Sequence, residues 1–183
     1  TIIISHFLHQ NGKHNTWLDA RKLIVTSDHF QEARVNWDKS QKNIHESISD
    51  RNKVYITQGF IGANKDGQTT TLGREGSDYS AAILAWSLDA NEVVIWKDVL
   101  GLLNADPKLF KNTQQLYQIS FKEAIELSYL GASVIHPKTV KPLQNKGIPL
   151  SIRSFLEHHA KGSVIGNLGE NDRDIPSFIF KPN

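Results

Sequence analysis

The chain has 183 residues, 39% of them apolar, which is enough to build the core of one domain of ordinary size. Its 21 basic and 19 acidic side chains nearly cancel, and no apolar run approaches the roughly 20 residues of a membrane span, so we expect neither a nucleic-acid nor a membrane partner. The absence of cysteine excludes disulfides and thiolate metal sites and suits the cytoplasm, where we expect the protein to lie.

Helical and extended patterns alternate along the first half of the chain. In chain order, the predicted elements are a helix that ends near Gly12, a strand over 22–26, a helix over 37–50, a strand over 53–59, a hairpin closed by the NKDG turn at 64–67, and a helix over 77–90. The last of these helices has small residues along one face, which would let it lie close to a sheet.

The second half continues the same alternation. The predicted elements are a strand over 92–96, a helix over 119–131, a helix over 137–146, a strand over 148–154 and a possible strand over 162–166. Ser120 and Glu123 have the spacing of a capping box, and Gly131 is placed to end that helix. Strands that alternate with helices predict an α/β fold with a largely parallel sheet.

The segment GREGSD, residues 73–78, places both signs of charge at the start of a predicted helix. Ser77 is a good N-cap residue, and Asp78 suits the positive end of the helix dipole. Arg74 offers a planar fork for a carboxylate or phosphate, Asp78 can hold an ammonium group, and the two glycines would let a ligand reach the backbone. Together they suit an amino acid; the alternative is a capped surface helix with a chance arginine.

Two further segments carry candidate residues. In IWKDVLGLLNADPK, a buried-type strand ends at Lys97 and Asp98, at the carboxyl edge where α/β proteins bind ligands. The alternative is a polar strand end followed by an ordinary loop. The segment GASVIHPKTV, residues 131–140, is mostly structural when taken by itself.

No metal site is predicted. The histidines near the start of the chain, and those that follow Glu157, have no third and fourth partner at a recognisable spacing, so they are interpreted as solvated side chains. Neither a GxxxxGK[ST] phosphate loop nor a GxGxxG dinucleotide fingerprint is present.

Three segments together resemble the aspartokinases, which are members of the amino-acid kinase family. They are QGFIGANKDGQTTTLGREGSDYSAAILA, IWKDVLGLLNADPK and ISFKEAIELSYLGASVIHPKTVKPLQNKGIPLSIRS, and the resemblance runs in order from about Trp17 to Ile165. It implies ATP-dependent phosphorylation of the side-chain carboxylate of L-aspartate to 4-phospho-L-aspartate with Mg²⁺, the first step towards lysine, threonine and methionine. It also implies a three-layer α/β/α sandwich with an amino-acid lobe and a nucleotide lobe.

The resemblance assigns roles to individual residues. Arg74 would grip a substrate carboxylate with two hydrogen bonds, and Asp78 would hold the substrate amine or orient a catalytic lysine. The other residues assigned to the aspartate site are Phe60, Gly62 and Ser77. The residues assigned to the nucleotide site are Lys97, Asp98, Leu103, Lys108, Ser133 and Val134.

Several of these positions depart from the family pattern. The family usually has Thr at 97, an aromatic residue at 103, Arg at 108 and Lys at 133, where this chain has Lys97, Leu103, Lys108 and Ser133. The lysine at 133 is the most serious loss, because in the family it neutralises charge on the transferring phosphoryl group. We expect Lys97 to replace it as a catalytic cation; the alternative is a solvated lysine at a strand end in an impaired enzyme.

The resemblance also implies missing parts. The family's amino-terminal strand with its catalytic lysine, and the regulatory ACT domains, have no counterpart in these residues. We therefore expect residues 1–168 to be a catalytic domain truncated at its amino end and inactive alone, and 169–183 to be a connector. The parent would be a homo-oligomer formed through the ACT region. A non-catalytic nucleotide-binding pseudoenzyme or regulatory module stays open as the alternative, whereas a kinase of acetylglutamate or UMP is disfavoured by GREGSD and GASVIHP together.

Overall fold

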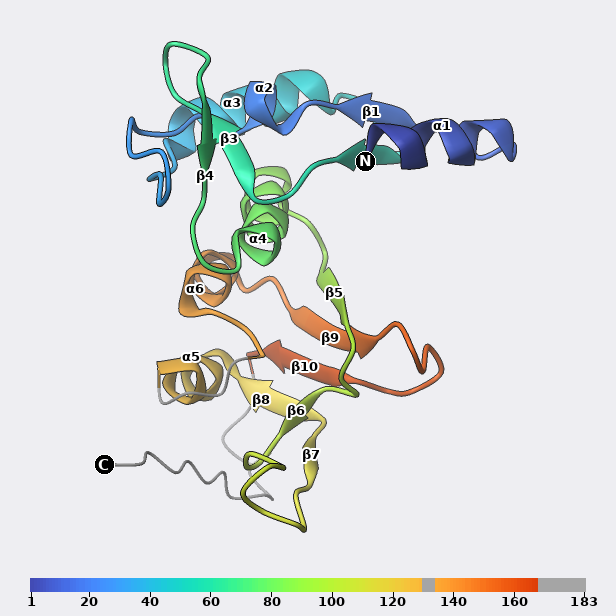
Figure 1. Cartoon of the computed structure of the whole chain (residues 1–183), viewed down its shortest axis with the longest axis vertical. Helices are drawn as coiled ribbons and strands as arrows, with labels where there is room; N and C mark the ends of the chain where they lie inside the picture. Colours follow the sequence, from blue (N-terminus) through green and yellow to red (C-terminus); the bar gives the residue numbers. More distant parts are fainter. Residues whose placement is uncertain (130–133, 168–183) are drawn as a thin grey trace. The chain divides into compact units, whose positions relative to one another are not determined.

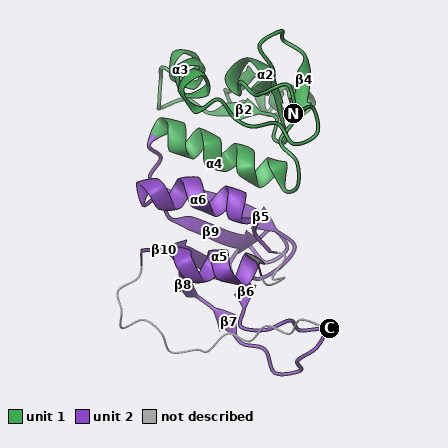
Figure 2. Cartoon of the chain, turned by 90° about the vertical axis from the view of Figure 1, so that its left-hand side faces the viewer, with its two compact units in different colours: residues 1–88 green, residues 89–183 purple. Residues whose placement is uncertain are grey.

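The computed structural model describes residues 1–129 and 134–167, and the chain divides into two compact units, residues 1–88 and 89–183 (Figure 2). Gly131, Ser133 and the predicted connector 169–183 lie outside the described residues. In the described part of the chain, no helix is long and apolar enough to cross a membrane.

The first unit combines short paired strands with four helices in its described residues (Figure 1). Its elements are α1 (Ile2–Gln10), β1 (Thr16–Leu18), α2 (Ala20–Leu23), α3 (Trp37–Ser47), β2 (Tyr55–Thr57), β3 (Ile61–Ala63), β4 (Thr69–Thr71) and α4 (Gly76–Leu88). Strands β1 and β2 pair in parallel, and β3 and β4 form an antiparallel pair. The hairpin predicted around the NKDG turn is therefore confirmed.

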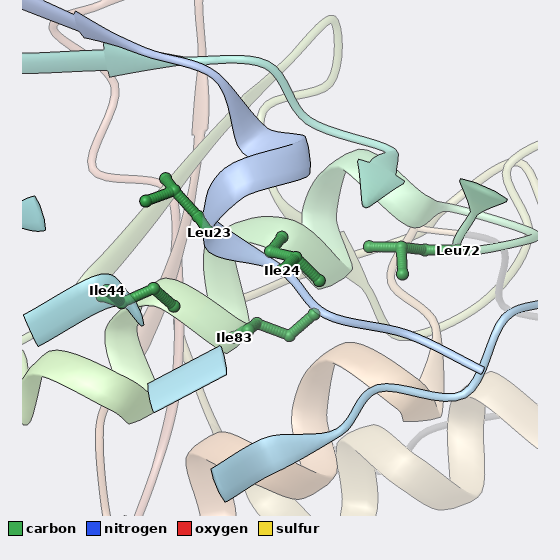
Figure 3. Packing of buried hydrophobic residues seen from close by; sticks show 5 residues of the cluster. All are labelled: Leu23, Ile24, Ile44, Leu72 and Ile83. Carbon is green, nitrogen blue, oxygen red and sulfur yellow. The ribbon is translucent and has the colours of Figure 1, made fainter. Parts of the chain in front are cut away.

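The core of the first unit gathers apolar side chains from segments far apart in the sequence (Figure 3). Its buried members, each at most 2% exposed, are Leu23, Ile24, Ile44, Leu72 and Ile83. Trp37 and Tyr79 pack against this cluster, with their ring centroids 6.3 Å apart in an edge-on arrangement. Burial raises the pKa of the Tyr79 phenol, because the charged form loses its hydration.

Residues 22–26 do not form the predicted strand. The backbone turns instead into the short helix α2, because the Asp19 carboxylate accepts a hydrogen bond from the Arg21 amide at 3.0 Å and caps the helix start. The neighbouring guanidinium also lowers the pKa of Asp19. After the helix the backbone is extended at Ile24, and Val25 and Thr26 form isolated bridges to Ala63 and Val35.

The helix predicted over 77–90 begins one residue earlier, at Gly76, and the prediction that Ser77 caps it is wrong. Glu75 precedes the helix with a left-handed backbone (φ 53°), and its carbonyl accepts the first helical hydrogen bond, from Tyr79, at 3.1 Å. Ser77 therefore lies inside the first turn as an exposed residue.

In its described residues, the second unit is built on a four-stranded sheet, with one hairpin beside it (Figure 1). Its elements are β5 (Val93–Lys97), β6 (Leu102–Leu103), β7 (Gln115–Leu116), β8 (Gln118–Ser120), α5 (Phe121–Tyr129), α6 (Pro137–Lys146), β9 (Leu150–Ser154) and β10 (Ser163–Gly166). The strand order is β5-β9-β10-β8, in which β5 with β9 and β10 with β8 are parallel and β9 with β10 is antiparallel. Helices α5 and α6 pack side by side on one face of this sheet (Figure 2).

The helix predicted over 119–131 begins at Phe121, because Ile119 and Ser120 belong to β8, and the helix predicted over 137–146 is confirmed as α6. The capping box is confirmed, since the Ser120 amide donates to the Glu123 carboxylate at 3.1 Å and the Glu123 amide donates to the Ser120 hydroxyl at 3.2 Å. Pro137 opens α6, and Gly147 ends it in the left-handed conformation (φ 65°).

We expect Ile83→Ala to destabilise the protein by about 3 kcal/mol, because this fully buried side chain would leave a cavity that its neighbours fill only in part. The measurement is the free energy of unfolding in urea. The control is Ile3→Ala on α1, where the side chain is 80% exposed and the cost should stay below about 0.5 kcal/mol. Equal effects of the two substitutions would contradict this description of the core.

Candidate functional site

The GREGSD loop is shaped by two residues with positive φ. Gly73 (φ 80°) and Glu75 (φ 53°) turn the backbone, and the Gly76 amide closes the turn by donating to the Gly73 carbonyl at 3.0 Å. Arg74 and Ser77 are exposed around this turn, and Asp78 is partly buried in the first turn of α4. The loop thus presents a guanidinium, a hydroxyl and a carboxylate within five consecutive residues.

The glycines of this loop have packing reasons. A side chain at Gly76 would place its Cβ 2.6 Å from Cδ2 of Phe60, and one at Gly73 would lie 2.8 Å from Cγ of Glu32. Close packing inside the first unit therefore accounts for glycine at both positions. Their predicted role in letting a ligand reach the backbone stays a prediction.

Phe60 lies beside the same loop. Its backbone is left-handed (φ 76°), its carbonyl accepts from the Leu72 amide at 2.9 Å, and its side chain is 41% exposed. The preceding Gly59 approaches Ser77 so closely that an added Cβ would lie 3.0 Å from the Ser77 Cα. The structure therefore brings the turn at 59–60 and the loop at 73–77 together, as the assigned aspartate site requires.

Gly62 lies deeper than the other residues assigned to this site. It is buried in β3, and an added Cβ would lie 2.6 Å from the Ile24 carbonyl oxygen. This glycine lets β3 approach the segment after α2, where the Ala63 amide donates to the Ile24 carbonyl at 2.9 Å. Its role in lining an aspartate site stays a prediction.

Two residues that the sequence reasoning did not single out belong to this region. The Ser80 hydroxyl, on a residue that is 2% exposed, accepts a hydrogen bond from the Phe60 amide at 2.9 Å. The Oε2 atom of Glu75 is buried and has no hydrogen-bond partner among the described residues. In the sequence, Ser80 stands out as a polar residue within an alanine-rich apolar run. Glu75 stands out as a large side chain in a turn, next to a glycine.

In the second unit, Lys97 and Asp98 lie at the carboxyl end of β5, as the sequence predicts, although this strand is only partly buried. Lys97 is the last residue of β5, opposite Ser154 of the parallel strand β9, and its carbonyl accepts from the Phe155 amide at 2.9 Å. Lys97 is partly buried and Asp98 is exposed. The carboxyl ends of two parallel strands thus meet at one edge of the sheet, with Lys97 at that edge.

The segment that leads to Leu103 is fixed at the same edge. Ser163 opens β10 opposite Ile152 of β9, and its hydroxyl accepts from the Leu102 amide at 2.8 Å. Leu103 follows, partly buried, in the β6–β7 hairpin. This contact brings Leu103 near the edge that carries Lys97, although the two residues come from different strands.

The other residues assigned to the nucleotide site are less constrained. Lys108 is exposed in a turn where its amide donates to the Asp106 carboxylate at 2.9 Å. Val134 is partly buried just before α6, and Ser133 lies outside the described residues. Within residues 1–129 and 134–167, no three histidine, aspartate or glutamate side chains are grouped so that they could hold a metal ion.

Comparison with known proteins points to one family. The model of the amino acid kinase family matches residues 2–154. The lysine-sensitive aspartokinase 3 of Escherichia coli (strain K12) is 36% identical over 173 residues, which are 93% of this chain and 38% of the relative. The bifunctional aspartokinase/homoserine dehydrogenase of Buchnera aphidicola is 38% identical over 155 residues, 85% of this chain and 19% of the relative. The chain thus spans between about a fifth and two fifths of the length of these relatives.

Solved structures agree with the sequence relatives. The crystal structure of E. coli aspartokinase III in complex with aspartate and ADP superposes with a TM-score of 0.87 at 36% identity and covers 93% of this chain and 38% of its own. The UMP kinase of Ureaplasma parvum, at 18% identity and a TM-score of 0.58 over 90% of this chain and 65% of its own, shares the fold alone. The predicted α/β fold is confirmed, and the chain belongs to the amino acid kinase family.

Proposed function

We propose that the protein containing this chain is an aspartate kinase. A side-chain carboxylate oxygen of L-aspartate attacks the γ-phosphorus of ATP, the bond from that phosphorus to the bridging β–γ oxygen breaks, and 4-phospho-L-aspartate and ADP leave. No side chain needs to form a covalent bond to the phosphoryl group in this reaction. The residues therefore act by positioning the reactants and by stabilising negative charge.

The likeness to E. coli aspartokinase III carries this proposal. That enzyme was solved with aspartate and ADP, and its TM-score of 0.87 exceeds the 0.58 of the Ureaplasma UMP kinase by a wide margin. The aspartate kinase of Clostridium acetobutylicum lies between them, with a TM-score of 0.73 at 29% identity. This order of TM-scores favours an amino acid over a nucleoside monophosphate as the phosphoryl acceptor.

The first unit carries the residues that suit the amino acid. The exposed Arg74 side chain can form two parallel hydrogen bonds to a carboxylate, which a lysine cannot do. Asp78 would attract the ammonium group or orient a catalytic lysine, and Ser77 can donate to a second oxygen. Phe60 and Gly62 would line the same site.

The second unit carries the residues assigned to the nucleotide. Lys97 would contact the phosphates, with Leu103, Lys108, Ser133 and Val134 as its assigned neighbours. The exposed Asp98 carboxylate fits Mg²⁺, which takes oxygen ligands and is usually held by one or two carboxylates together with substrate phosphates. When bound, Mg²⁺ would neutralise charge on the phosphate oxygens.

A non-catalytic nucleotide-binding protein of the same fold is the second candidate. It is favoured by one observation, the serine at position 133 where the resemblance predicts a lysine.

The two candidate functions differ in whether the protein turns over aspartate. We expect ADP release that depends on aspartate from the protein that contains this chain, and much less with UMP as the acceptor. Nucleotide binding without aspartate-dependent turnover would support the second candidate instead.

Arg74→Lys should raise the aspartate KM by at least tenfold and leave the ATP KM within about twofold, because a point charge cannot reproduce a two-bond fork. The measurement is steady-state kinetics with each substrate varied in turn. The matched control is Arg51→Lys, another exposed arginine of the first unit, which should change neither constant. An equal rise in both KM values would contradict the assignment of Arg74 to the aspartate site.

Lys97→Thr should lower kcat by about 10²–10³-fold, by analogy with the loss of one donor to a developing charge. The double variant with Ser133→Lys should recover a substantial part of that loss, because it restores a cation where the family carries one. The control is Lys13→Thr, an exposed lysine after α1. A kcat within about twofold of wild type for Lys97→Thr alone would mean that no charge has moved to position 97.

A further inference from the structure

One buried hydroxyl joins the two segments assigned to the aspartate site. The Ser80 hydroxyl accepts from the Phe60 amide at 2.9 Å and donates to the Gly76 carbonyl at 2.9 Å. Ser80 is 2% exposed and lies one helical turn after Gly76. A single side chain thus ties the turn at 59–60 to the start of α4, across 20 positions of sequence.

The first of these hydrogen bonds holds a strained residue. Phe60 has φ 76°, a conformation that is unfavourable for a bulky side chain and persists only where the surroundings impose it. Three contacts impose it: the Ser80 hydroxyl on its amide, the Leu72 amide on its carbonyl at 2.9 Å, and the bare Cα of Gly76 against its ring. The conformation places Phe60, a residue that is 41% exposed, with its ring against Gly76 of the GREGSD loop.

The second hydrogen bond alone would have an ordinary explanation. A serine inside a helix often donates to the carbonyl four residues earlier, and Ser80 does so. That hydrogen bond uses the hydroxyl hydrogen and does not require a partner for the oxygen. The Ser80 oxygen nevertheless accepts a hydrogen bond from the amide of a residue outside the helix, which the common helical pattern does not explain.

We infer that Ser80 is a positioning residue for the aspartate site. The inference rests on the proposed aspartate kinase function, and Ser80 itself is too deeply buried to contact substrate. It acts through Phe60, whose amide it binds and whose ring lies against Gly76, and through Gly76, whose carbonyl it anchors at the start of α4.

The chain offers a matched control on the same helix. Ser87 is also buried in α4, at 0% exposed, but its hydroxyl has no hydrogen-bond partner among the described residues. Ser80→Ala and Ser87→Ala remove the same atom from the same helix. Only the first substitution removes a contact to the turn at 59–60.

The experiment compares these variants in the protein that contains this chain. For Ser80→Ala we expect the aspartate KM to rise about tenfold, since losing the partner of the Phe60 amide costs about 1.4 kcal/mol, and the ATP KM to stay within about twofold. Ser80→Thr, which keeps the hydroxyl, should stay near the wild-type aspartate KM, as should Ser87→Ala. Partial unfolding does not imitate this result, because it lowers the active concentration and leaves KM unchanged.

Amide hydrogen exchange at Phe60 gives a second readout that does not depend on turnover. It should accelerate in Ser80→Ala and not in Ser87→Ala. An active wild-type protein whose aspartate KM is unchanged by Ser80→Ala would overturn the positioning role alone. So would an aspartate KM that rises equally in Ser80→Thr, because packing rather than the hydroxyl would then be responsible. A wild-type protein without aspartate-dependent turnover would overturn the proposed function, and this inference with it.

Discussion

The contact between the turn at Phe60 and the first turn of α4 constrains much of the first unit. The two segments approach so closely that a Cβ at Gly76 would lie 2.6 Å from the Phe60 ring, and one at Gly59 would be in tight contact, 3.0 Å from the Ser77 Cα. Phe60 has a left-handed backbone at this contact (φ 76°). Because α4 also supplies Ile83 to the core, the position of the candidate aspartate residues is coupled to the packing of the buried cluster.

Much of the fold could be predicted because its signals are local. The capping box at Ser120, the proline that opens α6 and the turn before β4 are each decided within a few residues. The strands Thr16–Leu18, Leu102–Leu103 and Gln115–Leu116 escaped prediction, because two or three residues are too few to show a period. The error at 22–26 has another cause, since an apolar run of that length suits a buried helix as well as a strand.

The candidate site was predictable to a lesser degree. The strand end at Lys97 follows from the apolar run before it, and the charges of the GREGSD loop can be read directly. The role of Ser80 could not be predicted from the sequence. Its hydrogen-bond partner, the Phe60 amide, lies 20 positions away, and no local sequence pattern indicates that the two residues meet. Ser77 was taken for the cap because its type suits that position, whereas the left-handed backbone of Glu75 moves the helix start to Gly76.

Buried serines serve a common purpose in both units. Irregular segments leave backbone amides without a partner in a helix or strand, and an unpaired buried amide is costly. Ser40 accepts from Val25 at 3.0 Å, Ser80 from Phe60 and Ser163 from Leu102, so in each case a hydroxyl on a regular element satisfies an amide of a distant segment. Ser80 and Ser163 each hold a segment next to residues assigned to one of the two predicted sites. A small hydroxyl suits this task because it fits into a packed interior at little cost in side-chain entropy, and it fixes one atom of the segment while leaving the neighbouring side chains exposed to a ligand.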